Sequence, residues 1–374
     1  MNANVHTAMS DWFQKGIVPT FKLSCYTVST SSSGYRTFTR YYAGDLTADY
    51  IDSDSIRWEA SRGTSFEPGG IVPSRLSVRI LPGCGGLTGI VATQRPTTFG
   101  QYDRAYEIIL QWQDEQSIYS TSIGGMYIVT SKSPTENGDA VSLEFLDELT
   151  VLDGFEYDLA DMPTSDYRTI VRNLFMTNGV PIADIVGVDD YIIAGNNYYR
   201  GNQMTARQAL SRILQMNGCY MLQLGQQFVI RPLNHTYGSA DVQMDREYSQ
   251  DYSFDEYEGE WTSAIINPPD DPIQYSGNSP TSYILKDNPL LSEGNKNTYA
   301  TTLQNRITNV SRHGFSIKYL CCPEIEVGDI VQMRFKMRPN VYTSKKMAVA
   351  RITWDGGAYF TLSEDLFDPM GRTA

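Results

Sequence analysis

The stretch that decides the fold runs from residue 288 to residue 330. It begins with Asn-Pro-Leu-Leu at 288–291 and ends with Pro-Glu-Ile-Glu-Val-Gly-Asp-Ile at 323–330. Between them, apolar residues recur at the spacing of one helix face, at Ala300, Leu303, Ile307 and Val310. Gly314 can close such a helix in a left-handed cap. The pattern predicts an amphipathic helix whose apolar face packs against another element.

The apolar period then changes to two. Phe315, Ile317 and Tyr319 alternate with other residues, which predicts a strand. The acidic turn Glu326–Asp329 leads into a second predicted strand, Ile330–Phe335. Further strands are predicted at Met347–Trp354 and Tyr359–Leu362, on either side of an Asp-Gly-Gly turn. The C-terminal part of the chain is therefore expected to form a small barrel.

The region from 18 to 158 has the pattern of several strands separated by turns. Short runs are rich in β-branched and aromatic residues, and Asn137-Gly138 marks the turn between the last two runs. An all-β barrel or sandwich is the expected closure, because it removes exposed strand edges. The strands are predicted at Thr20–Val28, Tyr35–Tyr42, Leu76–Leu81, Tyr106–Trp112, Gly125–Thr130 and Ala140–Leu146.

Two helices are predicted between these β-rich regions. The first follows Pro163-Thr164-Ser165 and ends at Gly179. The second begins with Thr205 and Gln208, which form a capping box, and it ends at Gly218. The apolar faces are Tyr167, Ile170, Val171, Leu174 and Phe175 in the first helix and Ala209, Leu210, Ile213 and Leu214 in the second.

A hairpin is predicted directly after the second helix. Its strands are Cys219–Leu224 and Gln227–Arg231. Gly225 and Gln226 form the two-residue loop, and glycine at the first position suits a type II′ turn. The two helices and the hairpin together predict a small α+β unit at about 163–233.

This order of elements resembles the tail hub, or baseplate hub, proteins of tailed bacteriophages. That family has a T-x-R-x-x-L-x-x-I helix before a hairpin, and a helix, strand and acidic Gly-Asp turn in its C-terminal part. A family strand of the form G-x-F/Y-x-V is matched by Gly125–Val129, whereas Phe145-Leu146-Asp147 departs from the usual A-x-D element. The matched motif positions are Thr205, Arg207, Leu210, Ile213, Asn288, Pro289, Pro323, Glu326, Gly328 and Asp329.

The resemblance implies a mainly β fold with an α+β insertion. Two tail-tube-like β-barrel domains, which are expected to superpose, would flank a small helix-helix-hairpin domain. The expected divisions are an N-terminal barrel at 1–160, the α+β domain at 161–233, an acidic and proline-rich connector at 234–296, and a helix with the second barrel at 297–374.

The resemblance also implies a structural virion protein and no enzyme activity. Three copies with two barrels each would form a ring that joins a six-fold tail tube to a three-fold tail tip around a DNA channel. The expected partners are further copies of the chain, a tail tube or distal tail protein, tail-tip spike or fibre proteins, and DNA in transit without specific binding. The expected location is the virion tail, assembled in the host cytoplasm.

Composition and charge limit the classes of function. The net charge of -13 argues against a DNA-binding protein, which needs clustered basic residues, but an acidic surface would let DNA slide through a channel. No apolar run approaches the roughly 20 residues needed to cross a bilayer, so membrane insertion is not expected. Residues 1–16 lack the apolar core of a secretory signal.

The sequence predicts no catalytic residue, metal site or cofactor. The five cysteines follow no metal-binding spacing, and the three histidines, His6, His235 and His313, are scattered. A Ser-His-Asp triad is therefore not expected. The glycine-rich segment Pro82–Gly86 lacks the Lys and the following helix of a phosphate-binding loop.

The acidic stretch at 241–260 has two interpretations. Its eight acidic residues lie among aromatic residues, and paired carboxylates such as Glu256 and Glu258 are what a glycoside hydrolase uses. A charged run without helical period is also typical of a solvated connector, and the prolines at 268–280 favour an extended linker after it. The alternative functions are a cell-wall polysaccharide hydrolase and a carbohydrate-binding adhesion module that uses the 25 tyrosines.

Overall fold

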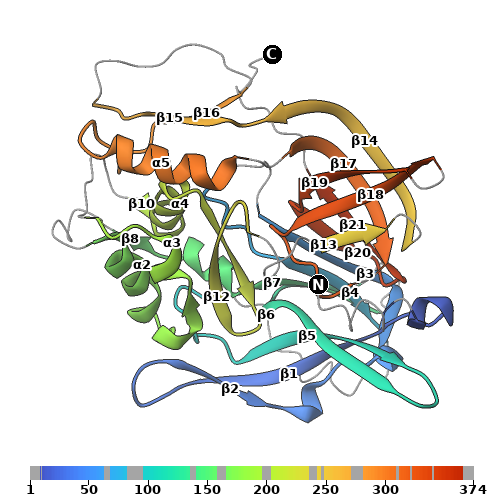
Figure 1. Ribbon diagram of the computed structural model, residues 1–374. Coiled ribbons are helices and arrows are strands. Elements are labelled where there is room, and N and C mark those ends of the chain that lie inside the picture. The colour runs from blue at the N-terminus through green and yellow to red at the C-terminus, as the bar shows by residue number, and fades with distance from the viewer. Residues whose placement is uncertain are drawn as a thin grey trace.

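The structure is a computed structural model that describes residues 9, 11–62, 68–81, 96–134, 140–157, 166–195, 204–235, 242–245, 248–270, 281–308, 311–320, 322–338 and 341–364. Figure 1 shows the labelled α-helices gathered on one side of the molecule and the C-terminal strands on the other, where a short N-terminal helix also lies. The N-terminal strands run beneath both groups, and a hairpin from the middle of the chain stands between them.

The N-terminal strands form one continuous antiparallel sheet in the order β3-β4-β7-β6-β5-β1-β2. Alternate residues of β5 are buried, as the period of two predicts for a strand with one face on a core. The bounds are Thr20–Thr30 for β1, Arg36–Arg40 for β2, Ile51–Ser61 for β3, Arg75–Ile80 for β4, Arg104–Gln113 for β5, Ile118–Pro134 for β6 and Val141–Asp147 for β7.

The predicted N-terminal strands are confirmed, with two corrections. Strand β3 was not expected, because its sequence, Ile-Asp-Ser-Asp-Ser-Ile-Arg-Trp-Glu-Ala-Ser, is mostly polar. Strand β6 begins at Ile118 instead of Gly125, because the Asp114 carboxylate accepts hydrogen bonds from Gln116 N and Ser117 N, both 2.8 Å, and closes a hairpin with β5. The predicted turn at Asn137-Gly138 lies outside the described residues.

The C-terminal strands are β17 (Ser311–Leu320), β18 (Ile330–Arg338), β19 (Val341–Ala348), β20 (Arg351–Trp354) and β21 (Tyr359–Glu364). The expected single strand Met347–Trp354 is divided between β19 and β20. The chain changes partners at this point, since Val349 N donates to Asp329 O at 2.9 Å and Ala350 N donates to Ser363 O at 3.1 Å.

The two β-rich regions belong to one sheet, which corrects the expectation of two separate barrels. Strand β20 pairs with β3 in antiparallel register, from Arg351 opposite Ser61 to Trp354 opposite Trp58. The described sheet runs β13-β18-β19-β17-β21-β20-β3-β4-β7-β6-β5-β1-β2, and β14 pairs with β17 beside this path. Pairing between residues almost 300 positions apart leaves no pattern in the local sequence.

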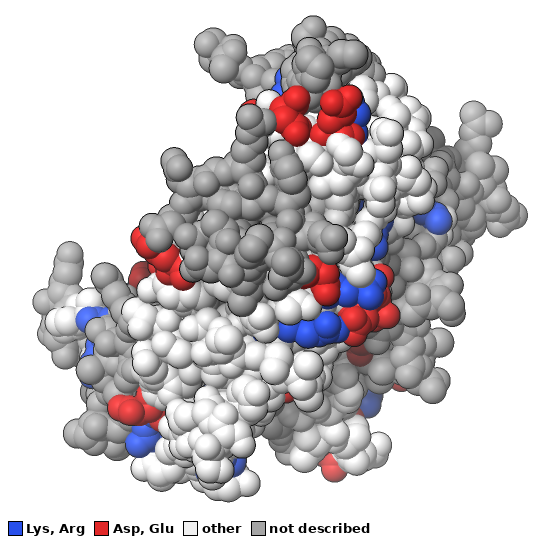
Figure 2. Space-filling view, turned by 90° about the vertical axis from the view of Figure 1, so that its left-hand side faces the viewer, with Lys and Arg blue, Asp and Glu red and all other residues white. Residues whose placement is uncertain are grey.

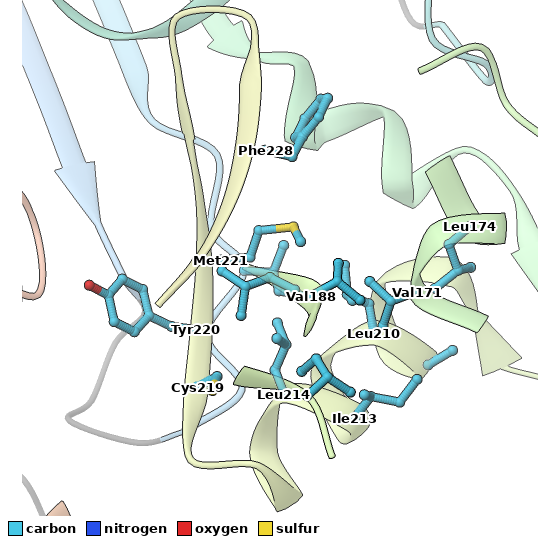
Figure 3. Close-up of a cluster of buried hydrophobic side chains, with 14 of the residues drawn as sticks. Val171, Leu174, Val188, Leu210, Ile213, Leu214, Cys219, Tyr220, Met221 and Phe228 are labelled. Atoms are coloured by element: carbon cyan, nitrogen blue, oxygen red, sulfur yellow. The ribbon is translucent and has the colours of Figure 1, made fainter. Parts of the chain in front are cut away.

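The helices lie against the middle hairpin. Helix α2 (Tyr167–Met176) and α4 (Ala206–Met216) bury the apolar faces predicted for them, and α3 (Val188–Tyr191) is a further short helix. Figure 3 shows Val171 and Leu174 of α2 and Leu210 and Leu214 of α4 in one apolar cluster with residues of the hairpin. The capping box is confirmed, since the Thr205 side chain accepts from Gln208 N and the Gln208 side chain accepts from Thr205 N.

The hairpin consists of β11 (Cys219–Leu224) and β12 (Gln227–Pro232) in the predicted register. Gly225 has a φ of 55° and Gln226 is not left-handed, as a type II′ turn requires. Strand β9 (Ile185–Val186), which follows the 3₁₀ helix η6 (Ile182–Asp184), adds a parallel neighbour to β12. Successive residues of β11 point to opposite faces, so the hairpin has contacts on both sides.

Helix α5 (Lys296–Ile307) ends earlier than predicted. Thr308, its C-terminal cap, is already extended, and Gly314 lies within β17 instead of capping the helix. The chain leaves the helix early because β17 pairs with β14 from residue 311 onward. The buried face is Tyr299, Leu303 and Ile307, with Ala300 partly buried, and the predicted face residue Val310 lies outside the described residues.

The expected connector at 234–296 contains strands. These are β13 (Val242–Asp245), β14 (Ser249–Glu260), β15 (Ser263–Asn267) and β16 (Ser282–Lys286). Most of the acidic stretch is therefore paired backbone, since β13 lies parallel to β18 and β14 lies antiparallel to β17. Strands β15 and β16 pair in parallel with each other, and the predicted linker residues 271–280 lie outside the described residues. Further up the chain, β8 (Glu156–Tyr157) pairs with β10 (Met204–Thr205).

Two hydrophobic cores hold the molecule together, and each draws on residues from more than one of the expected domains. One core contains the helices and the hairpin, together with Met126 and Ile128 of β6 and Ile330 of β18. The other joins N-terminal strands, through residues such as Ile108, to C-terminal strands, through residues such as Phe360. The N-terminal sheet therefore contributes to both cores.

Figure 2 shows the side of the molecule that carries the helices. The charged side chains drawn there form small groups separated by uncharged residues, and acidic and basic residues adjoin in some of them. The described part of this face has no continuous basic surface. Within the described residues, no helix is long and apolar enough to cross a membrane.

The capping box gives a test of how α4 is stabilised. Thr205→Ala removes the side-chain acceptor for Gln208 N, so we expect the free energy of unfolding in urea to fall by about 1 kcal/mol. The matched control is Thr301→Ala, because Thr301 is exposed inside α5 and its hydroxyl donates to the Asn297 carbonyl one turn earlier, which is not a capping contact. Equal destabilisation by both substitutions would contradict this account.

Candidate functional site

Two groups of buried and partly buried polar and charged residues hold the β11–β12 hairpin from opposite ends. The Glu148 cluster consists of Arg36, Tyr102, Glu148, Asp184 and Gln223. The Asp329 cluster consists of Tyr220, Arg231, His235, Glu326 and Asp329. Each cluster joins the hairpin to a segment far from it in the sequence, which makes the hairpin a junction between the parts of the fold.

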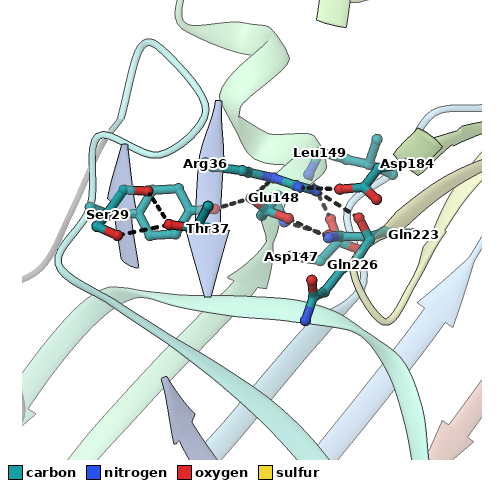
Figure 4. A network of polar contacts seen from close by, with 10 residues as sticks. Ser29, Arg36, Thr37, Asp147, Glu148, Leu149, Asp184, Gln223 and Gln226 are labelled. Carbon is teal, nitrogen blue, oxygen red and sulfur yellow. Dashed lines mark hydrogen bonds and ion pairs between the residues drawn. The ribbon is translucent and has the colours of Figure 1, made fainter. Parts of the chain in front are cut away.

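The Glu148 cluster centres on a fully buried ion pair. Arg36 Nε lies 2.9 Å from Glu148 Oε1, and both side chains have no exposed surface. The same guanidinium donates to Asp184 Oδ2 and to the Gln226 carbonyl, each at 2.7 Å, and Tyr102 donates to Glu148 Oε1. Figure 4 shows Arg36 reaching from β2 to Glu148, Asp184 and Gln226.

Gln223 completes the cluster from the hairpin. Its Nε2 donates to Glu148 Oε2 at 2.5 Å, and its Oε1 accepts from Glu148 N at 2.9 Å. Burial raises the pKa of Glu148, and the Arg36 charge and the Gln223 hydrogen bond oppose this rise. Glu148 directly follows β7 and lies in the first turn of the 3₁₀ helix η4 (Glu148–Asp153). At this position the Glu148 carboxylate faces the hairpin.

The Asp329 cluster connects the hairpin to the turn before β18. Asp329 Oδ2 accepts from Glu326 N at 3.0 Å, and Glu326 forms an ion pair with Arg231 of β12. Asp329 Oδ1 lies 3.9 Å from both Arg231 Nη1 and His235 Nε2, which is beyond hydrogen-bond distance. The motif residues Glu326 and Asp329 therefore shape the turn and attach it to the hairpin.

Burial shifts the pKa values of two residues in this cluster, Asp329 and His235. Loss of hydration raises the pKa of Asp329 to about 7, against hydrogen bonding from Glu326 N and the charge of Arg231. Burial and the Arg231 charge lower the pKa of His235 to about 4. At neutral pH the imidazole is neutral, so Arg231 is the cation that compensates the acidic residues of the cluster.

Gly328 permits the closest contact between the turn and the hairpin. Its φ of 92° is left-handed, and a Cβ at this position would lie 1.7 Å from the Tyr220 hydroxyl oxygen. In Figure 3 the Tyr220 side chain points away from the apolar cluster formed by α2, α4 and the hairpin. Its hydroxyl donates to the Val327 carbonyl at 3.0 Å. The glycine of the motif is therefore required by both backbone conformation and space.

The middle motif residues support the fold around α4. Thr205 caps the helix, and Leu210 and Ile213 are fully buried in the helix-side core. Arg207 donates to Asp153 Oδ2 at 2.9 Å and to the Leu149 and Ile71 carbonyls. Its position, two residues after the cap, lets it tie the helix to the segment that follows β7.

The remaining motif residues lie in two turns. Asn288 is buried, donates to the Arg212 carbonyl at 2.9 Å and accepts from Leu290 N at 3.0 Å. Pro289 follows it in the turn before α5, and Pro323 lies in the turn after β17. The structure therefore distributes the ten motif positions among packing, capping and turn roles, and it does not bring them together at one point.

The acidic and histidine residues singled out as possible catalysts have different outcomes. Glu256 and Glu258 lie in β14, but their side chains are outside the described residues. His235 belongs to the Asp329 cluster, His313 lies in β17 and His6 is not described. Among the described residues, no group of three or more His, Cys, Asp or Glu side chains could hold a metal ion.

The sequence did not indicate Arg36, Glu148, Gln223, Tyr220 or Arg231 as site residues. Their partners are distant in the chain, with Arg36 and Glu148 separated by 112 residues and Glu148 and Gln223 by 75. The sequence offers a local signal for Glu148, because the acidic pair Asp147-Glu148 directly follows the apolar run of β7, but this signal is weak. Acidic residues at the end of a strand are too common to identify a cluster.

The Arg36–Glu148 pair gives a quantitative prediction. Arg36→Met replaces the guanidinium side chain with an apolar one of similar length and leaves Glu148 buried without its cation. We therefore expect the free energy of unfolding to fall by about 3 kcal/mol or more. Arg79→Met removes a partly exposed partner of Asp52 and should cost less than about 1 kcal/mol. Urea denaturation measures both, and equal losses would show that burial of the pair is unimportant.

The raised pKa of Asp329 predicts a pH effect. The folded protein keeps Asp329 protonated up to about pH 7, whereas the unfolded chain ionises it near 3.8, so this residue lowers stability as pH rises through that interval. Asp329→Asn removes this loss. The melting temperature of the variant relative to wild type should therefore increase from pH 4 to pH 7 and level off above that range.

The lowered pKa of His235 makes the folded protein more stable as the pH rises from about 4 to 6.5, which is the opposite effect. Because wild type and Asp329→Asn both contain His235, this effect cancels when their melting temperatures are compared. Asp190→Asn, at an exposed position on α3, serves as the matched control. A difference in melting temperature between Asp329→Asn and wild type that does not change with pH would contradict the assignment.

The comparisons with known proteins concern the fold. No protein-family model and no curated protein matches the chain. The prophage tail protein gp18 from Listeria monocytogenes EGD-e has a similar structure, with a TM-score of 0.51 and 12% sequence identity over 92% of this chain and 94% of that one.

Two further solved structures match over similar lengths. The 43 kDa tail protein of prophage MuSo2 from Shewanella oneidensis gives a TM-score of 0.48 and 9% identity over 94% of this chain and 99% of that one. The tail protein from Neisseria meningitidis MC58 gives a TM-score of 0.48 and 11% sequence identity over 92% of this chain and 97% of that one. The structural similarity to the Listeria protein shows that this chain has the fold of a phage tail protein.

Proposed function

We propose that this chain is a structural protein of a phage tail and that it forms the hub between tail tube and tail tip. The observation that carries the proposal is the fold, which nearly the whole chain shares with a prophage tail protein. The hub assignment rests in addition on the motif residues, because Thr205, Arg207, Gly328 and Asp329 hold the helix, the hairpin and the acidic turn together.

The open sheet supports a role in assembly. Among the described strands, the path through the sheet ends at β2 on one side and at β13 on the other. Edge strands carry backbone donors and acceptors that are not used within the sheet, and assembled proteins cover them with neighbouring chains. In the proposed ring, three copies meet head to tail around a three-fold axis, and the contact repeats until the ring closes.

The charge of the chain supports passage of DNA. A net charge of -13 means that a channel formed by three copies would not hold phosphates by counterion release. The described part of the face in Figure 2 likewise has no continuous basic surface. We propose a channel wall that is acidic or neutral, along which DNA moves without specific contacts.

The proposed partners follow from the position of a hub. They are further copies of this chain, a tail tube or distal tail protein on the six-fold side, and spike or fibre proteins at the tip. The proposed location is the virion tail, with assembly in the host cytoplasm. The β11–β12 hairpin suits a part that must stay rigid between two neighbours. Hydrogen bonds of Gln223 and of the Gln226 carbonyl hold it on one side, and the Arg231–Glu326 ion pair holds it on the other.

The proposal includes no catalytic role. The buried carboxylates of the two clusters are engaged with Arg36 and Arg231, whereas the catalytic carboxylates of a glycosidase flank the bond that they cleave. Most of the acidic stretch that suggested a hydrolase is backbone-paired in β13 and β14. These contacts favour a structural role for both regions.

Assembly is the direct test. The purified chain of 42.0 kDa, alone and mixed with its tail tube or distal tail neighbour, should form a trimer in light scattering at several concentrations. Electron microscopy of the same samples should show rings with three-fold symmetry. Assembled tails that contain one or six copies at this level, or a channel lined mainly by Lys and Arg, would contradict the hub proposal.

A further inference from the structure

A pocket of about 320 Å³ lies beside the β11–β12 hairpin, and its lining includes one residue of each charged cluster, Gln223 and Glu326. Its walls come from β3, from the start of β6, from the tip of the hairpin, from the turn at 323–327 and from the strands β20 and β21. Exposed Ser122 lies on its rim, and Asp147 is a buried charged residue in its wall. The volume is within the range of sites that bind small molecules.

Two aromatic rings form part of the wall. Trp58 and Phe360 have ring centroids 5.9 Å apart and are tilted by 41° relative to each other. The Trp58 indole Nε1 donates to the Tyr127 hydroxyl at 2.8 Å, which fixes the orientation of the ring. Aromatic faces carry partial negative charge, so they attract cations that have lost their water.

Asp147 adds a full negative charge. Its Oδ2 accepts from Ser74 N and Ser74 Oγ, both at 2.7 Å, and its Oδ1 accepts from Leu149 N at 3.0 Å. A carboxylate has about four acceptor positions, so one remains for the N–H of an ammonium group, whereas a quaternary ammonium group would be attracted by the charge of Asp147 alone. Burial raises the pKa of Asp147 to about 6, and the group is therefore ionised at neutral pH.

The other lining residues restrict the ligand further. None of the described residues that line the pocket is Lys or Arg, which disfavours phosphate and carboxylate ligands. The Gln223 amide is used in both directions by Glu148, and Glu326 is paired with Arg231, so neither is available to a ligand. The apolar residues Ile123, Ile325 and Ile352 supply an aliphatic wall for alkyl groups.

We propose that this pocket, at Trp58, Asp147 and Phe360, binds a small organic cation, namely an ammonium or quaternary ammonium group on a short apolar body. The carboxylate compensates the charge, and the two rings and the aliphatic wall cover the alkyl groups. The proposal does not rest on the hub function, because it is argued from the contacts of Trp58, Asp147 and Phe360 within one copy of the chain.

Choline is the probe, and 3,3-dimethyl-1-butanol is its neutral isostere. Titration calorimetry and saturation-transfer NMR on the full chain should show saturable binding of choline, with the isostere weaker by about tenfold or more because it lacks the charge. Asp147→Asn should weaken choline binding by about tenfold or more and leave the isostere nearly unchanged. The exposed acid Asp190 supplies the matched control, Asp190→Asn, which should bind as wild type.

A second variant keeps the test decisive if Asp147→Asn folds poorly, since an Asn whose oxygen accepts from the two Ser74 donors would turn its NH₂ group toward Leu149 N, which also donates. Ser122→Trp changes an exposed residue at the rim and should abolish choline binding without altering the circular dichroism spectrum. The proposal is overturned by any one of three results: no saturable choline binding, equal binding of choline and the isostere, or unchanged binding in the folded Ser122→Trp variant.

Discussion

The Glu148 carboxylate, which is fully buried, requires partners from three distant parts of the chain. Arg36 comes from the second strand, Tyr102 from the segment before β5, and Gln223 from the hairpin. An uncompensated charge at this position would cost several kcal/mol, roughly half of the stability of an ordinary domain. The cluster therefore forms only when the N-terminal sheet, η6 and the hairpin are all in place, which makes their relative positions unique.

The second charged cluster applies the same constraint on the C-terminal side. Arg231 extends from β12 toward Glu326 and Asp329, and Tyr220 reaches across to the Val327 carbonyl next to Gly328. The hairpin is thus fixed at both ends by polar contacts, while its helix-side face is covered by apolar side chains (Figure 3). A rigid central element of this kind suits a protein that transmits position from one neighbour to another in an assembly.

Most of the individual elements could be predicted from sequence because their information is local. The face Tyr167, Ile170, Val171, Leu174 and Phe175 follows the helical period, and the Thr205–Gln208 capping box and the Gly225 turn depend on residues a few positions apart. The errors occur where local and distant preferences conflict. Gly314 could end a helix, but pairing with β14 places it in a strand, and the acidic run at 241–260 forms β13 and β14 in spite of its charge.

The sequence by itself determined a mainly β chain with two central helices, a tight hairpin and an acidic surface charge. Only the tertiary structure decided that β3 and β20 join both β-rich regions in one sheet, and that Arg36 meets Glu148 and Arg231 meets Glu326. The physical reason is that strand pairing and ion pairing act through space. Their partners lie about 100 to 300 residues apart, so neither residue carries a local mark of the other.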